Sequence, residues 1–402
     1  MKFLDQSAAV LWKNPYFSSG VLPLTGTAAH VKLFTKHVIK RIEAVRFTFR
    51  KENSTIRGGR PQLAFARRAV PGIAMKSAEI TREEMQRVYD AMKTPVKHGM
   101  VLCEEGANID CPNIFQKKDG TFAMAFAKHV PGAEREGYET WLAESSDLIH
   151  WTPVGKLLAH TESGWDCLQA DGSICLLDTD WDGNHSVHTY DGKYWMTYIG
   201  GCLPGYEPDP LKMGIAWSET ITPGSFTRLP DPILTNTDPD VRPFEKTTLY
   251  KSNVIEDPDE TLGWPFIMFY NAKAGRFGIE CIGMAVSRDM IHWQRYGENC
   301  VVSNDIEDRW NIAGDPQVIR FGDLWVMHYF VARDMMAYDT FACSRDLVHW
   351  TKWDGEPFVK PTMPYDKLFA HKPYVFQHNG TVYHFYCAVG DSGRGIALAT
   401  SR

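Results

Sequence analysis

The chain has 402 residues, of which 44% are hydrophobic and 23% charged, and its mean hydropathy is -0.30. This composition is typical of a soluble chain with a large core and excludes disorder as its dominant state. The formal net charge of -6 gives no basic face for nucleic acid, and no apolar run reaches the roughly 18 residues that cross a membrane, so neither is expected as a partner.

The first 76 residues carry basic pairs such as Lys40-Arg41 and Arg67-Arg68 and show no repeat. They are either an arm that packs on the rest of the chain or on a second copy, giving a homodimer, or a poorly ordered or incorrectly assigned extension. Residues 1 to 20 lack the long apolar region of a secretory signal. We therefore expect a cytoplasmic protein, with a periplasmic or secreted location as the alternative if the N-terminus is incorrectly assigned.

A helix near residues 81–93 is predicted next. Thr81-Arg-Glu-Glu84 has the pattern of a capping box, and Pro95 must end the helix that follows. We assign residues 1–97 to an N-terminal extension that is helical or irregular, and residues 98–402 to a second domain.

That second domain contains an internal repeat. The pattern S-x-D-x-x-H-W occurs at 145–151, 287–293 and 344–350. A second series, a turn glycine before an apolar, aromatic-rich strand, recurs at spacings of 72, 71, 59 and 58 residues, at Gly120, Gly192, Gly263, Gly322 and Gly380. Five units of four strands each predict an all-β fold, a five-bladed β-propeller. The Ser and Asp of the repeat are expected to hold a tight turn, and the Trp to pack between blades.

The last unit contains only three strands before the chain ends. A fourth strand must come from elsewhere, and residues 98–103, just before the first blade, are the natural candidate. Pairing the two ends of the domain would close the ring.

The innermost strands of a propeller line its axial channel, so their first residues meet at one mouth. The predicted starts are rich in ionisable side chains, namely Asp110, Asp182, His185, Glu245, Lys251, Asp315, His371 and Lys372, with Asp180 beside Asp182. Clustered, buried carboxylates repel one another, which raises the pKa of at least one of them. One protonated and one ionised carboxyl group are what glycosidic bond cleavage needs, and Trp165, Tyr138 and Tyr206 lie in nearby connections, where they could stack on a sugar.

The S-x-D-x-x-H-W repeats, the five units and strand starts such as Asp315-Pro316 resemble the five-bladed β-propeller glycosidases, the superfamily of glycoside hydrolase families 43, 32, 117 and 130. Phrases such as Gly137-Tyr-Glu-Thr-Trp141 and Phe369-Ala-His-Lys372 are similar to bacterial enzymes of this type, and the resemblance covers residues 80 to 402. It implies a propeller fold and glycosidase activity, and says little about the substrate.

The resemblance also implies roles for three acids. Asp110 matches the base or nucleophile that opens blade one. Glu245 lies where the acid of blade three is expected but lacks the Glu-Gly-Pro context, and Asp315 has the Asp-Pro context but lies in blade four. The assignment of the acid and of the residue that tunes its pKa therefore stays open between these two.

Three functions follow from these features. The first is an exo-acting, inverting glycoside hydrolase that removes terminal sugars from plant, algal or host oligosaccharides, with Asp110 activating water. The second is an inverting phosphorylase, with Lys251, Lys372, His371 and Arg135 as its anion site. The third is a non-catalytic carbohydrate-binding propeller.

No cofactor is predicted. The nine cysteines show no zinc-binding or redox spacing, and we interpret them as small buried apolar residues. A metal ion at the centre of the channel is compatible with the sequence, but no spacing requires one.

Overall fold

The computed structural model describes residues 79–275, 279–304, 311–333 and 335–402, all within one compact unit. The predicted N-terminal arm and its role in a homodimer lie outside the described residues. Among the described residues, no helix is long and apolar enough to span a membrane.

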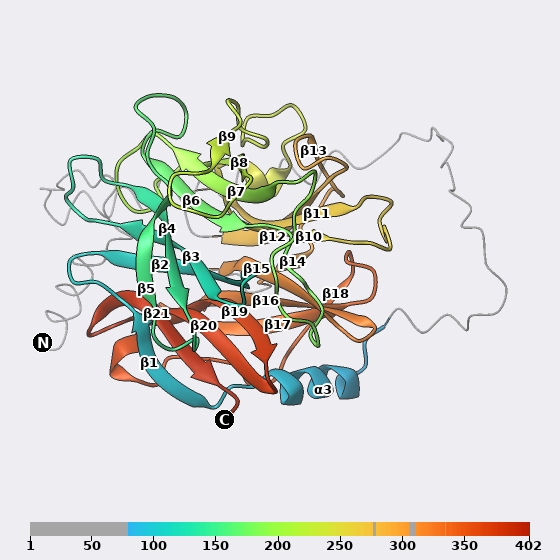
Figure 1. Ribbon diagram of the computed structural model, residues 1–402. Helices are drawn as coiled ribbons and strands as arrows, with labels where there is room; N and C mark the ends of the chain where they lie inside the picture. Colours follow the sequence, from blue (N-terminus) through green and yellow to red (C-terminus); the bar gives the residue numbers. More distant parts are fainter. Residues whose placement is uncertain (1–78, 276–278, 305–310, 334) are drawn as a thin grey trace, which may run out of the picture. The chain divides into compact units, whose positions relative to one another are not determined.

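The strands form two hydrogen-bonded sheets, in which five antiparallel units of four strands, the blades, surround a central axis (Figure 1), and this confirms the predicted five-bladed β-propeller. Blade one consists of β2 (Asn108–Gln116), β3 (Phe122–His129), β4 (Tyr138–Ser145) and β5 (Thr152–Leu158), and blade two of β6 (Gln169–Ile174), β7 (Tyr194–Gly201), β8 (Lys212–Ser218) and β9 (Thr227–Arg228). Blade three consists of β10 (Thr248–Glu256), β11 (Phe266–Lys273), β12 (Ile279–Ser287) and β13 (Trp293–Arg295), with β14 (Val302–Ser303) also paired to β12. Blade four consists of β15 (Asn311–Phe321), β16 (Leu324–Arg333), β17 (Met336–Ser344) and β18 (Trp350–Lys352), and blade five of β19 (Phe369–His378), β20 (Thr381–Gly390), β21 (Gly393–Thr400) and β1 (Val96–Leu102).

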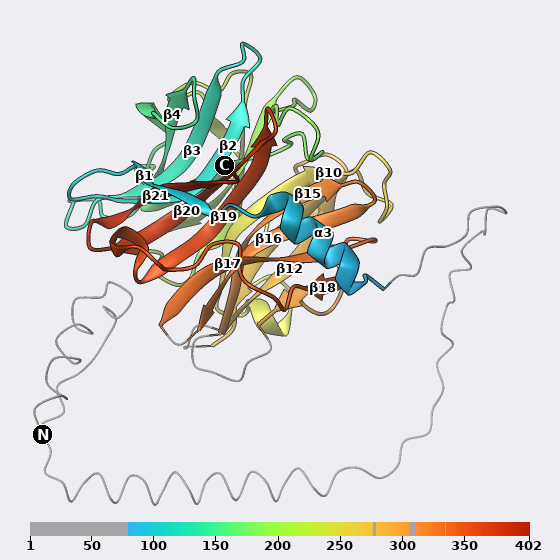
Figure 2. The same cartoon turned by 90° about the horizontal axis from the view of Figure 1, so that it is seen from below.

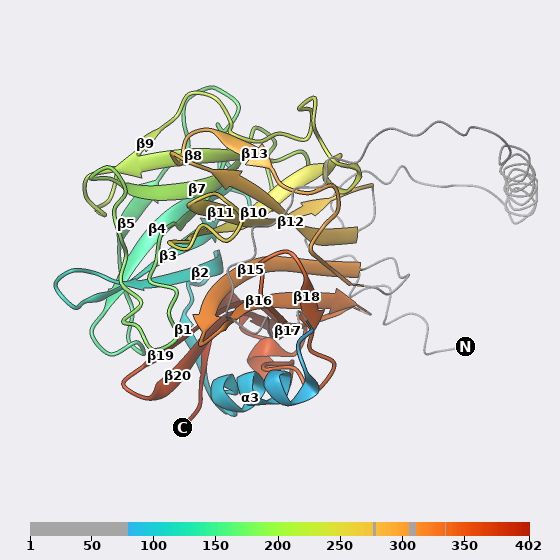
Figure 3. The same cartoon turned by 90° about the vertical axis from the view of Figure 1, so that its right-hand side faces the viewer.

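The core lies between neighbouring blades. Figure 3 shows blade three, in yellow and brown, beside blade four, in orange, and one apolar cluster joins the two, including Ile267 and Met284 from blade three and Val318 and Met327 from blade four. Because each sheet is covered on both faces, its strands read as continuous apolar runs.

Closure of the ring occurs as predicted, by pairing the two ends of the domain. β1 runs antiparallel to β21, with Val96 opposite Thr400 and Leu102 opposite Ile396 (Figure 1). The predicted strand, 98–103, overlaps β1 in all but its last residue. Lys97 adds an ion pair to the buried carboxylate of Asp366.

The predicted helix is also present, as α3 (Arg82–Met92). Thr81 and Glu84 form the expected capping box. The helix buries Met85, Val88 and Met92 in a cluster with side chains of blades four and five (Figure 2). It therefore packs as part of the propeller.

The S-x-D-x-x-H-W repeat holds the turn between the third and fourth strands. In blade three, Asp289 Oδ1 accepts hydrogen bonds from the backbone N–H groups of Ile291 and His292, at 3.0 and 2.8 Å, and Ser287 Oγ accepts one from Met290. The Trp of the repeat packs across blade boundaries, as Trp350 does against Phe269 of blade three, with ring centroids 5.7 Å apart. Both structural roles predicted for the repeat are confirmed.

Four of the five inner strands have a β-bulge near their start. The register shifts between Asp110 and Asn113, Leu249 and Ser252, Gly314 and Gln317, and His371 and Tyr374. In three of these bulges the central residue has positive φ and precedes a proline, namely Cys111 (53°), Asp315 (47°) and Lys372 (61°). A bulge redirects side chains, and proline is tolerated there because no ladder hydrogen bond is required. The bulges therefore bring side chains of different blades together at one level of the channel.

Candidate active site

The inner strands enclose a small cavity at the level of these bulges. Its volume is about 30 Å³, and each blade contributes to its wall, through Cys111, Ser173, Lys251, Asp315 and Lys372 together with their neighbours. A space of this size holds about two water molecules. It therefore forms the floor of a site, and a larger ligand must lie above it, at the mouth.

Asp110 is a buried hub beside this floor. Its Oδ2 accepts hydrogen bonds from Tyr206 Oη (2.5 Å), Arg394 Nη1 (2.7 Å), Tyr138 Oη (3.2 Å) and Lys372 Nζ (3.3 Å). Burial alone would raise the pKa of Asp110, but the charges of Lys372 and Arg394 hold it well below its usual value. The carboxylate is 0% exposed, so it cannot contact water or a sugar. This environment does not fit the catalytic base predicted for Asp110, and fits a residue that holds four others in place.

Lys372 is the cation at the centre of the site. Its Nζ lies 3.0 Å from Glu207 Oε1, 3.3 Å from Cys111 Sγ and 3.9 Å from Asp315 Oδ2, in addition to its contact with Asp110. Although burial disfavours the ammonium form, these neighbours raise the pKa of Lys372 well above its usual value. The lysine therefore stays charged.

A second buried pair joins blades two and three. Lys251 Nζ binds the carboxylate of Asp171, and it donates a hydrogen bond to Gly172 O at 3.0 Å. Although burial opposes it, the carboxylate of Asp171 raises the pKa of Lys251 above its usual value.

Three acids of this site have raised pKa values. Burial raises the pKa of Glu280 to about 8 and that of Asp315 to about 7, and it also raises the pKa of Glu207. The negative charge of Glu207 contributes to the shifts of the other two, so the three groups interact through space. At neutral pH the site therefore contains protonated and ionised carboxyl groups together, which is the condition for general acid and base catalysis.

Glu207 lies in the connection between β7 and β8, which several contacts hold against the channel. Gln169 Nε2 donates to the backbone carbonyls of Leu203 and Gly205, each at 3.0 Å. Asp209 forms an ion pair with Lys273 of blade three at 2.6 Å. The loop is thus fixed from two blades, and Glu207 is kept beside Lys372.

Glu280 comes from the start of β12, the third strand of blade three. Asn271 Nδ2 donates a hydrogen bond to Glu280 Oε2 at 3.0 Å, and the backbone of Glu280 pairs with that of Ile312 at the start of β15. The side chain is half-buried.

The structure brings together many of the residues predicted from the sequence: Asp110, Tyr138, Tyr206, Lys251, Asp315, His371 and Lys372. His371 lies in the same bulge as Lys372, and its Nδ1 lies 3.0 Å from Cys387 O. Burial lowers the pKa of His371 to about 3, so the imidazole is neutral and cannot serve as a cation for a ligand.

Glu245 does not belong to this group. It is fully buried in a short 3-10 turn (Pro243–Glu245), where it accepts hydrogen bonds from Arg242 Nη2 at 2.6 Å, Arg295 Nε at 2.8 Å and Tyr270. Burial opposes ionisation, but Arg242 and the hydrogen bond from Tyr270 lower the pKa of Glu245. A carboxylate enclosed by these partners does not fit the general acid predicted for Glu245.

Asp182 and His185 are also displaced from the mouth. The inner strand of blade two is β6, which precedes them, and their loop lies at the other end of the channel. There Gln377, near the end of β19, approaches Asp182, and His185 stacks on Phe376 at 4.6 Å. The predicted start of blade two was therefore wrong. The charged residue near the start of this inner strand is Asp171, in β6.

Trp165 is a structural residue within blade two. Its ring stacks on Tyr198 with centroids 5.6 Å apart, and its Nε1 donates to Pro230 O at 3.1 Å. The predicted role in stacking on a sugar does not fit these contacts.

Four charged residues of the site were not predicted from the sequence: Glu207, Glu280, Arg394 and Asp171. The charged candidates were sought at the starts of inner strands, whereas Glu280 and Arg394 lie at the starts of third strands, and Glu207 lies in a loop. A usable signal existed, because a charged residue at the start of an otherwise apolar third strand recurs in blades three and five.

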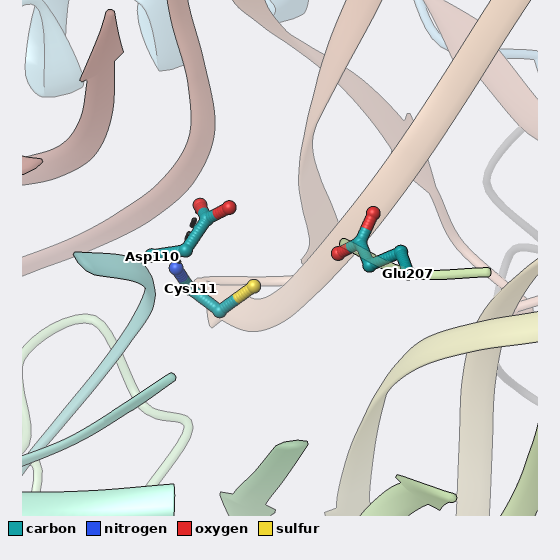
Figure 4. Close-up of side chains that lie close together, drawn as sticks. All are labelled: Asp110, Cys111 and Glu207. Atoms are coloured by element: carbon teal, nitrogen blue, oxygen red, sulfur yellow. Dashed lines mark hydrogen bonds between the residues drawn. The ribbon is translucent and has the colours of Figure 1, made fainter. Parts of the chain in front are cut away.

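One group of potential metal ligands occurs among the described residues. Oxygen atoms of Asp110 and Glu207 and the Cys111 sulfur lie within 4.8 Å of one another (Figure 4). The ammonium of Lys372, however, contacts all three residues. The lysine supplies the positive charge that this group needs, so the arrangement does not fit a metal ion.

The solved structures include proteins similar to this one. One, described as a BT0996 complex with RGII, is 42% identical with a TM-score of 0.77, and the match covers 81% of this protein and 96% of that one. Another, described as "Glycoside hydrolase", is 41% identical with a TM-score of 0.76 and the same coverage. A thermostable family-43 glycoside hydrolase is 17% identical with a TM-score of 0.54, over 77% of this protein and 91% of that one, which shows the fold alone. No family model and no curated protein sequence matches this sequence.

Proposed function

The protein belongs to the glycoside hydrolases, since a member of that group is 41% identical to it over 96% of the member's own length, and we propose that it removes terminal sugars from an oligosaccharide with inversion of configuration. The observation that carries the proposal is a set of three acids with raised pKa values: Glu207 and Asp315 lie beside Lys372, and both contribute to the raised pKa of Glu280. A propeller that only bound sugars would have no need for carboxyl groups held in different protonation states.

Glu280 is the proposed general acid. With a pKa of about 8 it is protonated at neutral pH and able to donate a proton to the leaving glycosidic oxygen. Its position in blade three agrees with the blade that the family resemblance implies for the acid, although the residue differs from the one predicted.

Glu207 is the proposed base that activates water. It lies 3.0 Å from Lys372 Nζ, and this positive charge favours the ionised form against the effect of burial. Glu207 and Glu280 come from different blades, an origin that supports the separation of roughly 6.5 to 9.5 Å that an inverting enzyme uses to admit water between its two acids.

The small size of the floor cavity supports the exo mode. A cavity of about 30 Å³ cannot hold a sugar ring, so we propose that the sugar lies above it and that the channel accepts no chain through its floor. A blind site accepts the end of an oligosaccharide more readily than its middle. The 42% identical structure, described as a complex with RGII, supports an RGII oligosaccharide as the first substrate to test.

Product analysis tests the proposal. The full-length protein is incubated with RGII oligosaccharides and with a panel of plant, algal and host oligosaccharides, and sugar release is followed by chromatography. NMR of the first product gives its anomeric form. We expect release of single terminal sugars with inverted configuration, and loss of at least 100-fold in kcat for Glu280→Gln, because general acid catalysis contributes about 10²–10⁴-fold.

The other outcomes separate the alternatives. Turnover that requires phosphate identifies a phosphorylase, but this result is not expected, because Lys251 and Lys372 are already paired with carboxylates, His371 is neutral, and Arg135 binds backbone carbonyls. Binding of a glycan without release of sugar by the wild type contradicts the hydrolase proposal and favours a binding module.

A further inference from the structure

Two pairs of cysteines have their thiols in contact, and the two pairs lie in different blades. The first pair is Cys167, in the segment before β6, and Cys202, directly after β7. β6 and β7 run antiparallel, with Gln169 opposite Gly201, and the ladder continues to Leu168, whose N–H donates to Gly201 O at 2.9 Å. The backbone thus holds the two cysteines at the same end of paired strands.

The second pair is Cys281, in β12, and Cys300, just before β14. β14 runs antiparallel to β12, with Cys281 opposite Ser303 and Ile282 opposite Val302, and the N–H of Val301 donates to Ile282 O at 2.7 Å. Cys281 is buried, so a rigid part of the sheet fixes its side-chain direction.

The remaining cysteines have different surroundings. Cys111 contacts Lys372 and Asp315, Cys175 contacts Ser173 O, Cys387 contacts Arg394, Cys343 is buried in the core, and Cys103 is exposed. Their neighbours are ionised side chains, a backbone carbonyl, apolar side chains or solvent. Cys202 also has a backbone carbonyl neighbour, since its Sγ donates to Gly164 O at 2.7 Å. Contact with a second thiol is what distinguishes the two pairs from these five cysteines.

We propose that Cys167 with Cys202, and Cys281 with Cys300, form two disulfide bonds in the mature protein. With oxidised glutathione as the oxidant, one cysteine thiolate attacks a glutathione sulfur and releases one glutathione thiol. The second cysteine thiolate then attacks the mixed disulfide and releases the other. Each protein disulfide thus forms with the loss of two thiol protons and two electrons, and it reduces one glutathione disulfide to two glutathione thiols.

The positions of the bonds give them a role beyond stability. Cys202 begins the connection that carries Tyr206 and Glu207, and Cys281 directly follows Glu280 in β12. Each bond therefore fixes the backbone beside one of the two acids. This role rests on the proposed function, whereas the existence of the bonds does not.

The bonds also bear on where the protein works. Disulfides persist in oxidising compartments and are rare in the reducing cytosol. Of the two locations considered from the sequence, the periplasmic or secreted one is thus the one that the proposal favours.

Peptide mapping tests the bonds directly. The full-length protein is equilibrated with oxidised glutathione without denaturant, its remaining thiols are alkylated, and peptides from non-reducing digestion are identified by mass spectrometry. We expect the peptide of residue 167 linked to that of residue 202, and that of residue 281 linked to that of residue 300, each lighter by two hydrogens and each separated by a reductant. Alkylation of both members of a pair, or a link to Cys103, overturns the proposal for that pair.

Thermal unfolding separates a covalent bond from simple packing. Cys202→Ser and Cys300→Ser are compared with the wild type and with Cys103→Ser as the matched control, each with and without excess reductant. We expect each pair variant to lose several degrees in Tm in the oxidised samples and to match the wild type once both are reduced. An equal difference in both conditions means that the thiols act by packing alone, and overturns the proposal. Neither experiment requires sugar cleavage, so failure of the proposed function would not affect their outcome.

Discussion

Asp110 and Glu280 are both acidic residues of the same site, yet their neighbours give them opposite protonation states. Asp110 contacts Lys372 and Arg394 directly, and these charges outweigh the effect of burial on its pKa. Glu280 has one cation that opposes the effect of burial, Lys273, while Glu207 and Asp315 add to that effect. The role of a carboxyl group in this site thus depends on which side chains of other strands surround it.

The pH dependence of kcat tests the role of Glu280. A general acid must be protonated, so activity is expected to fall as pH rises through its pKa of about 8. Since the charge of Lys273 lowers that pKa, Lys273→Met is expected to raise it and to move the basic limb of the profile to higher pH. The measurement is kcat against pH for the wild type and the variant.

Lys193→Met provides the control, because that lysine is a residue of blade two that pairs with the exposed Asp191. It should leave the basic limb in place. A basic limb that stays in place or moves to lower pH in Lys273→Met would contradict the assignment of Glu280 as the acid.

At the scale of elements, one turn and one kind of bulge recur around the ring. The S-x-D turn joins third to fourth strands and places a Trp on the neighbouring blade, while the bulges turn residues such as Asp315 and Lys372 into the channel. The turn stabilises the blade and the bulge positions the chemistry. Their sequence patterns differ accordingly. The turn requires a fixed set of side chains, whereas three of the four bulges share only a following proline and the fourth has none.

Asp289→Ala is expected to destabilise the protein by about 1 kcal/mol, because two backbone N–H groups lose their acceptor, as at a helix N-cap. Although burial opposes it, hydrogen bonds from His292 and Ile291 hold the pKa of Asp289 at about 2. A lowered folded-state pKa contributes stability above the ordinary carboxyl value of about 4, and this contribution is lost as pH falls towards 2.

Urea unfolding at neutral pH and near pH 3 measures this difference. The advantage of the wild type over Asp289→Ala should shrink at the lower pH, and Asp259→Ala, at an exposed position, should have little effect at either pH. A difference between wild type and Asp289→Ala that does not depend on pH would show that the carboxylate charge is not involved.

At the scale of the molecule, stability depends on closing the ring. β1 is the only strand of blade five that precedes blade one in the described sequence, and it covers the edge of β21. Without β1, the edge of β21 would expose a row of unpaired backbone groups. Blade five would also lose the strand that links it to blade one.

Removal of residues 98–103 is therefore expected to abolish the cooperative unfolding transition. Circular dichroism and tryptophan fluorescence during urea unfolding provide the measurement. Lys97→Met, which keeps β1 and removes only the contact with Asp366, should keep a single sharp transition. A native-like transition in the deletion variant would show that the ring does not need this closure.

The sequence alone determined the architecture, because its repeats describe local structure. The S-x-D turns, the turn glycines and the capped helix each depend on residues close in sequence, so their spacing was enough to predict five blades, α3 and closure by residues 98–103. The same pattern placed Asp315, Lys251 and Lys372 at strand starts, where they lie. It misplaced Asp182 and His185 because the blade-two repeat is degenerate and its inner strand ends before them.

Only the tertiary structure decided which acids can do chemistry. Glu245 and Glu280 are both glutamates of blade three, and nothing in their sequence neighbourhoods distinguishes a carboxylate held by two arginines from one kept protonated. The sequence spacing of the cysteines likewise did not predict the two thiol contacts, Cys167 with Cys202 and Cys281 with Cys300. The physical reason is the same in both cases: charge interactions and bond formation depend on distances through space, and the folding of five blades around one axis sets those distances.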